Sequence, residues 1–140
     1  MLSIRILIVD DCQPWRRMVL AMLEGLPDCQ IVDEAADGLE AIQKIAELRP
    51  DLVLLDIGLP VMNGLETARR LCAISSDSKV LFVSENLAVE VVREALSTGA
   101  QGYILKSDAA HELLPAITAV AEGRQFMSAR LASCFGVPPV

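Results

Sequence analysis

Three carboxylates, one hydroxyl and one ammonium follow directly on short apolar runs of the chain. They belong to Asp10, Asp11, Asp56, Ser84 and Lys106. Clustered carboxylates repel one another, so they either take up protons or bind a hard cation such as magnesium, which prefers oxygen ligands. Beside a cation, Asp56 could stay ionised and attack phosphorus, while Lys106 and Ser84 contact the phosphoryl oxygens. These residue types point to phosphoryl transfer, which depends mainly on positioning and electrostatics.

The elements that must position these residues alternate along the chain. Almost continuous apolar runs predict five strands, at residues 4–9, 30–34, 52–55, 80–83 and 102–105. Continuous rather than alternating runs are typical of a parallel sheet covered on both faces. The segments between them have apolar residues three and four apart, which indicates helices. The sequence therefore predicts an α/β fold, a three-layer sandwich of five βα units with one parallel sheet. Ligands bind outside the carboxyl ends of such strands, so all five polar residues should meet at one rim.

Helix ends are marked by turn and capping residues. Gly99 and Gly123 stand where a glycine ends the fourth and fifth helices, and Ser107 or Asp108 could cap the fifth. Pro115 falls inside that fifth helix, where it removes a backbone donor. We expect a kink there, or a helix that begins late.

Composition limits the classes of function. A chain of 140 residues with 53% apolar residues can build one core, and a net charge of −7 argues against binding nucleic acid or an anionic membrane. No window approaches the ~18 apolar residues of a membrane span. The four scattered cysteines form no zinc motif, and we expect free, mostly buried thiols in a cytoplasmic protein. The only histidine, His111, should lie on a helix surface away from the rim.

Several motifs together resemble the receiver domains of bacterial two-component response regulators, the CheY-like superfamily with its flavodoxin-like fold. They are the Asp10-Asp11 pair, Asp56-Ile-Gly-Leu-Pro-Val-Met-Asn-Gly, Ser84, and Gly99-Ala-Gln-Gly-Tyr-Ile-Leu-Lys106. The similarity covers residues 3–123. The segment Glu34-Ala-Ala-Asp-Gly-Leu-Glu-Ala resembles the corresponding segment of the NarL/FixJ branch. Members of this branch usually carry a C-terminal helix-turn-helix. The resemblance thus implies a receiver domain at residues 1–123 and a tail or linker at 124–140, leading to an output domain.

The resemblance also implies roles at the rim. Asp56 would accept the phosphoryl group from a sensor histidine kinase or a phosphotransfer protein. Asp11 and Asp56 would bind Mg²⁺ with the backbone carbonyl of Gly58, and Asp10 would act partly through water. Lys106 would pair with the acceptor and then with the phosphoryl group. Transfer and dephosphorylation would be self-catalysed, so the chain would be no turnover enzyme.

A switch is implied as well. Ser84 would swing toward the phosphate and Tyr103 would rotate into the space released, which would reshape the face made by the fourth helix, fifth strand and fifth helix. From the residues alone, Tyr103 is a half-buried strand aromatic. The resemblance also implies a possible homodimer on phosphorylation, but no exposed apolar stripe in the sequence identifies its face.

Several residues depart from the family's pattern. Glu85 follows Ser84 where relatives carry a small residue, and it could modulate acceptance or hydrolysis. Lys106 precedes Ser107 instead of a proline, which leaves open whether that peptide is cis. Cys12 and Trp15 follow the acid pair and could edge the site, although packing or covering the loop is the favoured interpretation.

Alternatives differ in class. A magnesium-dependent phosphohydrolase would need a second acid two residues after Asp56, where the chain has Gly58. A degenerate receiver would bind partners without phosphorylation. The output could be transcription through a DNA-binding domain outside this chain, or protein–protein interaction by a single-domain regulator.

Overall fold

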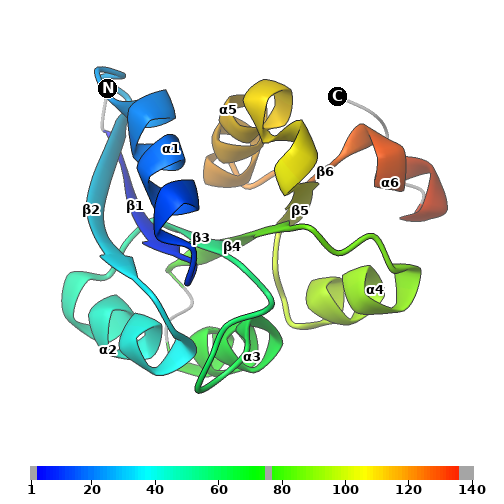
Figure 1. Ribbon diagram of the computed structural model, residues 1–140, viewed down its shortest axis with the longest axis horizontal. Coiled ribbons are helices and arrows are strands. Elements are labelled where there is room, and N and C mark those ends of the chain that lie inside the picture. The colour runs from blue at the N-terminus through cyan, green and yellow to red at the C-terminus, as the bar shows by residue number, and fades with distance from the viewer. Residues whose placement is uncertain (1–2, 75–76, 136–140) are drawn as a thin grey trace.

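Short runs of leucine, isoleucine and valine form a parallel sheet with the strand order β2-β1-β3-β4-β5-β6 (Figure 1). The computed structural model describes residues 3–74 and 77–135. Within them the strands are β1 (Ile4–Val9), β2 (Cys29–Ala35), β3 (Leu52–Leu55), β4 (Lys79–Ser84), β5 (Gly102–Leu105) and β6 (Phe126–Met127). The order reverses direction between β1 and β3, which are hydrogen-bonded neighbours. In open α/β sheets this reversal is where ligands bind.

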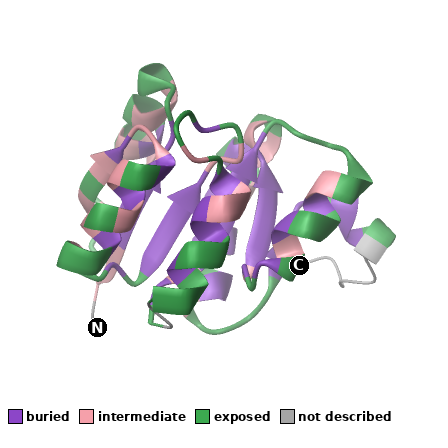
Figure 2. Ribbon diagram, turned by 90° about the horizontal axis from the view of Figure 1, so that it is seen from below, coloured by how far each residue is buried: buried purple, intermediate pink, exposed green. Residues whose placement is uncertain are grey.

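Helices cover both faces of the sheet. They are α1 (Gln13–Leu23), α2 (Gly38–Leu48), α3 (Gly64–Ile74), α4 (Val89–Ser97), α5 (Ala109–Ala121) and α6 (Ala129–Phe135), with a 3-10 turn η1 (Lys106–Asp108) before α5. Helices α1 and α5 lie on one face, and α2, α3 and α4 on the other (Figure 1). Figure 2 shows the central strands buried and the helices exposed on their outer sides.

Successive strand residues point to opposite faces, which divides the core in two. Leu7 and Val9 of β1 pack with α2 and α3, whereas Ile6 and Ile8 pack with α1 and α5. Because both faces are buried, the strands carry apolar residues at every position. The predicted α/β sandwich is therefore confirmed, and the observed bounds of the five predicted strands match or exceed the predicted ones by one residue.

The predicted count of five strands is too low by one in the described part of the chain. Strand β6 pairs parallel to β5, with Gly102 opposite Phe126 and Tyr103 opposite Met127. Two residues carry no periodicity, so the apolar pattern could not reveal this strand. Helix α6 follows, where the sequence predicts one short helical turn near residues 128–133, and its Leu131 is 4% exposed. The sheet and core thus continue beyond residue 123.

Ser128 connects this C-terminal segment to β5 and α5. Its side chain is fully buried, its Oγ accepts from the Leu105 N–H at 2.9 Å, and it donates to the Glu112 carboxylate. The Ser128 N–H donates to the Tyr103 carbonyl at 3.0 Å. The other Glu112 oxygen accepts from the Ala129 N–H at the start of α6. The pairing of β5 with β6 ends at Tyr103 and Met127. Beyond it, the Ser128 side chain accepts the next β5 hydrogen bond, from the Leu105 N–H.

Predictions about the fifth helix are partly wrong. Helix α5 runs from Ala109 through Pro115 without a late start. Asp108 occupies the position before it but makes no capping hydrogen bond, because its carboxylate pairs with Arg130 of α6 at 2.6 Å. Gly99 and Gly123 follow their helices with φ of +101° and +84°, as the sequence predicts.

The expected burial of the cysteines is also wrong. Cys12, Cys72 and Cys134 are exposed and Cys29 is half-buried, although all four are free as predicted. In the described residues, no helix combines the length and hydropathy needed to cross a membrane.

Replacement of Ser128 by alanine tests whether β6 and α6 belong to the folded domain. We expect S128A to lower the free energy of unfolding by about 1–3 kcal/mol, because the buried Leu105 N–H and Glu112 carboxylate lose a partner. The matched control is S133A, an exposed serine of α6, with a change below about 0.5 kcal/mol. Urea denaturation measures both. Equal values for the two variants would contradict this account of the C-terminal segment.

Candidate functional site

The rim predicted from the strand ends exists as a single open cleft. Residues following β1, β3, β4 and β5 line it, together with loop residues beside them. The lining is Asp11, Cys12, Asp56, Ile57, Gly58, Ser84, Glu85, Asn86 and Lys106. In β1 and β3, Val9 lies opposite Leu55, and the Asp56 N–H donates to the Val9 carbonyl at 3.0 Å. This register brings the acid pair beside Asp56.

Three carboxylates cluster at the cleft, and two of them, Asp11 and Asp56, line it. One oxygen from each of Asp10, Asp11 and Asp56 lies within 4.8 Å of the others. Asp10 is 1% exposed, Asp56 is half-buried and Asp11 is exposed. A set of oxygen ligands open to solvent on one side suits a hard cation that keeps part of its water shell.

Lys106 lies between two of these carboxylates. Its Nζ is 2.7 Å from Asp10 Oδ2 and 3.8 Å from Asp56 Oδ2. The resemblance paired Lys106 with Asp56, but the direct contact in this structure is with Asp10. Asp10 Oδ1 also accepts from the Cys12 N–H at 2.9 Å, so the most buried carboxylate is the best compensated.

The unequal compensation appears in the pKa values. Burial raises the pKa of Asp56, and the negative charges of Asp10 and Asp11 raise it further. Lys106 and the Ile57 N–H lower the same pKa only in part. Burial alone would lower the pKa of Lys106, but its hydrogen bond to Asp10 and the charge of Asp56 outweigh burial and raise it. A cation beside Asp56 would therefore favour its ionised form.

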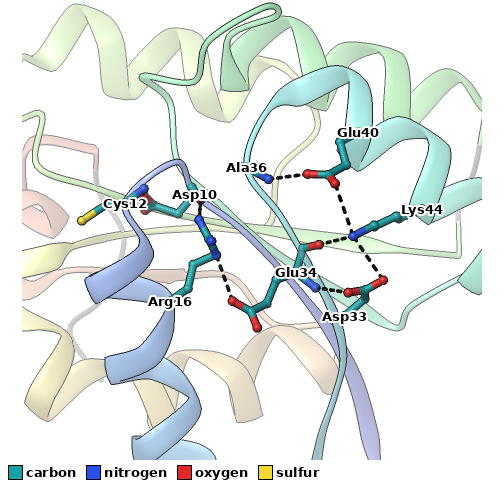
Figure 3. Close-up of polar contacts among 8 residues, drawn as sticks. All are labelled: Asp10, Cys12, Arg16, Asp33, Glu34, Ala36, Glu40 and Lys44. Atoms are coloured by element: carbon teal, nitrogen blue, oxygen red, sulfur yellow. Dashed lines mark hydrogen bonds and ion pairs between the residues drawn. The ribbon is translucent and has the colours of Figure 1, made fainter.

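An arginine that the sequence patterns did not single out ties the end of β1 to β2 (Figure 3). Arg16 Nη1 donates to the Asp10 carbonyl at 2.6 Å, and its Nε pairs with Glu34 at 2.8 Å. On β2, the Glu34 carbonyl accepts from Lys44, which also pairs with Asp33 at 3.2 Å. Arg16 thus holds the backbone from which Asp10 projects. Nothing in its spacing distinguishes it from a surface arginine.

Ser84 and Tyr103 meet at one loop residue. The Ser84 Oγ accepts from the Asn86 N–H at 3.1 Å, and the Tyr103 hydroxyl donates to the Asn86 carbonyl at 2.8 Å. Tyr103 is fully buried, not half-buried, and its burial raises its pKa. The ring is already in the inward position toward which the resemblance implies a rotation. Asn86 was not among the predicted site residues.

The structure also places the residues for which the sequence left more than one interpretation open. Glu85 is exposed and borders the cleft, and its charge contributes to the raised pKa of Lys106. Cys12 borders the cleft as well. Trp15 packs against the core as predicted, but its ring also lies 5.0 Å from Lys106 Nζ, so the interpretation as packing alone is incomplete. The Lys106–Ser107 peptide is trans, as is every peptide bond of the described residues, and His111 is exposed as predicted.

The loop after β3 depends on a glycine for its course. The Gly64 N–H donates to the Ile57 carbonyl at 2.7 Å, and a Cβ at Gly64 would overlap the Asp56 carbonyl oxygen. This close return holds Gly58 at the cleft beside Asp56.

Comparisons with known proteins show which family this chain resembles over most of its length. The family model described as the response regulator receiver domain matches residues 6–118. The transcriptional regulatory protein LiaR of Bacillus subtilis is 33% identical over 129 residues, which are 92% of this chain and 61% of LiaR. The nitrate/nitrite response regulator NarL of Escherichia coli K12 is 37% identical over 126 residues, covering 90% and 58%. The chain therefore spans about three fifths of the length of these relatives.

Solved structures are similar throughout the described fold. A LuxR-family two-component response regulator from Aurantimonas sp. SI85-9A1 superimposes with a TM-score of 0.89 at 33% identity, covering 94% of each chain. The signal receiver domain of the putative response regulator NarL from Mycobacterium tuberculosis gives 0.84 at 31% identity, covering 89% of this chain and all of that one. The chain belongs to the response regulator receiver domains, and within them to the NarL/LuxR type.

Proposed function

We propose that this chain is a phosphorylation switch in which Asp56 accepts a phosphoryl group in a Mg²⁺-dependent reaction. The observation that carries the proposal is the cluster of three carboxylates within 4.8 Å, with the Lys106 ammonium between Asp10 and Asp56. Family membership supports it, because receiver domains are typically phospho-acceptors.

The donor set of the cleft fits magnesium. Asp11 and Asp56 would hold the ion with the backbone carbonyl of Gly58, and Asp10 would contact it partly through water. Bound there, the ion would supply positive charge that offsets the carboxylates and the incoming phosphoryl group. Gly58 also leaves no second carboxyl group two residues after Asp56, so no general acid for a turnover phosphohydrolase stands at that position.

The reaction forms a bond from Asp56 Oδ to phosphorus and breaks the bond from phosphorus to a nitrogen of the donor histidine. The product is an acyl phosphate on Asp56, and the departing imidazole takes up a proton. Lys106 then exchanges its contact with Asp10 for the phosphoryl oxygens. Because Lys106 Nζ already lies 3.8 Å from Asp56 Oδ2, this exchange needs only a side-chain movement.

The switch would act through Asn86. If Ser84 turns its Oγ toward a phosphoryl oxygen, it releases the Asn86 N–H. The carbonyl of the same residue accepts from the Tyr103 hydroxyl, so Asn86 links the two side chains. The loop from Glu85 to Ala88 and the face made by α4, β5 and α5 would then change shape together.

We further propose the setting of this switch. A sensor histidine kinase or phosphotransfer protein would supply the phosphoryl group in the cytoplasm, and phosphorylation could promote a homodimer. The relatives are transcriptional regulators longer than this chain, and a similar structure is described as a DNA-binding response regulator of the LuxR family from Staphylococcus aureus. The output would therefore be transcription, through a DNA-binding domain outside these residues.

Labelling with a small phosphodonor tests the acceptor. We expect the wild type to be labelled by radioactive acetyl phosphate with Mg²⁺, and D56N to lose more than about 90% of the label because its amide is a poor nucleophile. D51N is the matched control, since Asp51 is an exposed carboxylate at the opposite end of β3 and should leave labelling unchanged. Equal labelling of D56N would overturn the assignment. An unlabelled wild type would favour a receiver that acts by binding alone.

Unfolding without metal tests the electrostatics of Asp56. Its raised folded pKa favours the protonated folded form, so this contribution to stability is full below the unfolded pKa of about 3.9 and is lost as pH rises through the folded pKa. We therefore expect D56N to be more stable than wild type near pH 7, by on the order of 1 kcal/mol, with the difference shrinking toward pH 4. Added Mg²⁺ should raise the melting temperature of wild type more than that of D56N. A pH-independent difference would contradict this account.

Neutralising Glu85 tests its effect on the mouth of the cleft. We expect E85Q to be labelled about threefold faster by acetyl phosphate. The donor is an anion, and the substitution removes one negative charge that repels it from the cleft. The gain should shrink in high salt. E90Q, which removes an exposed charge from α4, is the matched control and should label at the wild-type rate. A slower E85Q would show that Glu85 assists transfer.

A further inference from the structure

Lys106 has an aromatic neighbour that the proposed reaction does not use. The Trp15 ring centroid lies 5.0 Å from Lys106 Nζ, within the range of a cation–π contact. Only 12% of the Lys106 side chain is exposed, so the contact is largely shielded from water. Shielding strengthens the attraction between an ammonium and a ring.

Trp15 reaches this place from the first turn of α1. The helix begins with Gln13 and Pro14, and Pro14 favours the start of a helix because its fixed φ suits that position. The indole is half-buried and packs on the core between the sheet and helices α1 and α5. Its position is therefore set by the fold and not by Lys106.

A second hollow adjoins the acidic cleft at this point. It is lined by Trp15, Glu85, Lys106 and Ser107, and Lys106 and Glu85 also border the cleft itself. Lys106 thus borders both hollows, with Asp11 and Asp56 in the cleft and the Trp15 indole in the hollow beside it. The ammonium is restrained by Asp10 through a short ion pair and by Trp15 through its ring.

These two restraints respond differently when the site is used. A cation beside Asp10 would compete with Lys106 for its carboxylate, so the ion pair between Asp10 and Lys106 would weaken when a cation binds. The ring of Trp15 carries no charge and lies outside the carboxylate cluster. It can keep its contact while Lys106 turns from Asp10 to Asp56, 3.8 Å away.

We propose that Trp15 is a positioning residue that keeps the Lys106 ammonium within reach of Asp56 when Asp10 turns to the cation. The inference rests on the proposed phosphorylation of Asp56. Trp15 touches neither the acceptor nor the phosphoryl group, and it acts through Lys106 alone.

Labelling rates with acetyl phosphate and Mg²⁺ give the first test. We expect W15L to be labelled about threefold to thirtyfold more slowly than wild type, and W15F to lie between them because it keeps a ring. L20A is the matched control, since Leu20 is a half-buried residue of α1 that packs on the same core. L20A should lose stability but keep the labelling rate. Equal slowing in W15L, W15F and L20A would overturn the proposal, because loss of packing would then suffice.

Fluorescence gives a readout that a purely structural role would not move. Trp15 is the only tryptophan of the chain, so its emission reports the neighbourhood of Lys106 without a label. We expect Mg²⁺ alone, and Mg²⁺ with beryllofluoride, to change the emission of wild type but not of K106M. An unchanged wild-type emission, or an equal change in K106M, would overturn the contact. If acetyl phosphate failed to label the wild type, the proposed function would fall. The Mg²⁺ titration would still decide whether the Lys106 ammonium moves relative to the Trp15 ring when the cation binds.

Discussion

Mutual repulsion of three carboxylates at the ends of β1 and β3 is the constraint on which the rest of this site depends. Asp10 is almost fully buried, and it is tolerated there because Lys106 and the Cys12 N–H both contact its carboxylate. Burial and the charge of Asp10 raise the pKa of Asp56, and its one backbone N–H and more distant ammonium offset them only in part. The folded chain therefore holds an electrostatic cost at Asp56 that a cation can relieve. Negative charge that the protein leaves incompletely offset favours the binding of a cation at such a site.

The sheet order supplies the proximity that this repulsion requires. Only the reversal between β1 and β3 puts the acid pair beside Asp56, and β4 and β5 then bring Ser84 and Lys106 along the same edge. Both faces of these strands are buried, so the rim cannot shift without disturbing the core. The buried layer fixes the backbone positions from which the carboxylates project, whereas Lys106 reaches them through a long side chain.

Strand ends and residue types were sufficient to predict the α/β sandwich and to bring Asp11, Asp56, Ser84 and Lys106 to one cleft, but not Asn86. Continuous apolar runs mark buried parallel strands, and the rule for their carboxyl ends needs no distances. What failed depends on side-chain geometry or on very short elements. The choice of Lys106 between Asp10 and Asp56 is a difference of about one ångström in a flexible chain, and the contact of Trp15 links residues far apart in sequence. Strand β6 has two residues and therefore no period to recognise.

The C-terminal segment is hydrogen-bonded to β5 and to the turn that follows it. Ser128 contacts β5 at the Tyr103 carbonyl and the Leu105 N–H, on either side of Ile104. Arg130 of α6 then reaches the turn after Lys106, through Asp108 and Ser107. The backbone of β5 around both Tyr103 and Lys106 is therefore bonded to residues 128–130. A side-chain rotation of Lys106 leaves these bonds intact, whereas a movement of the β5 backbone must carry the start of α6 with it.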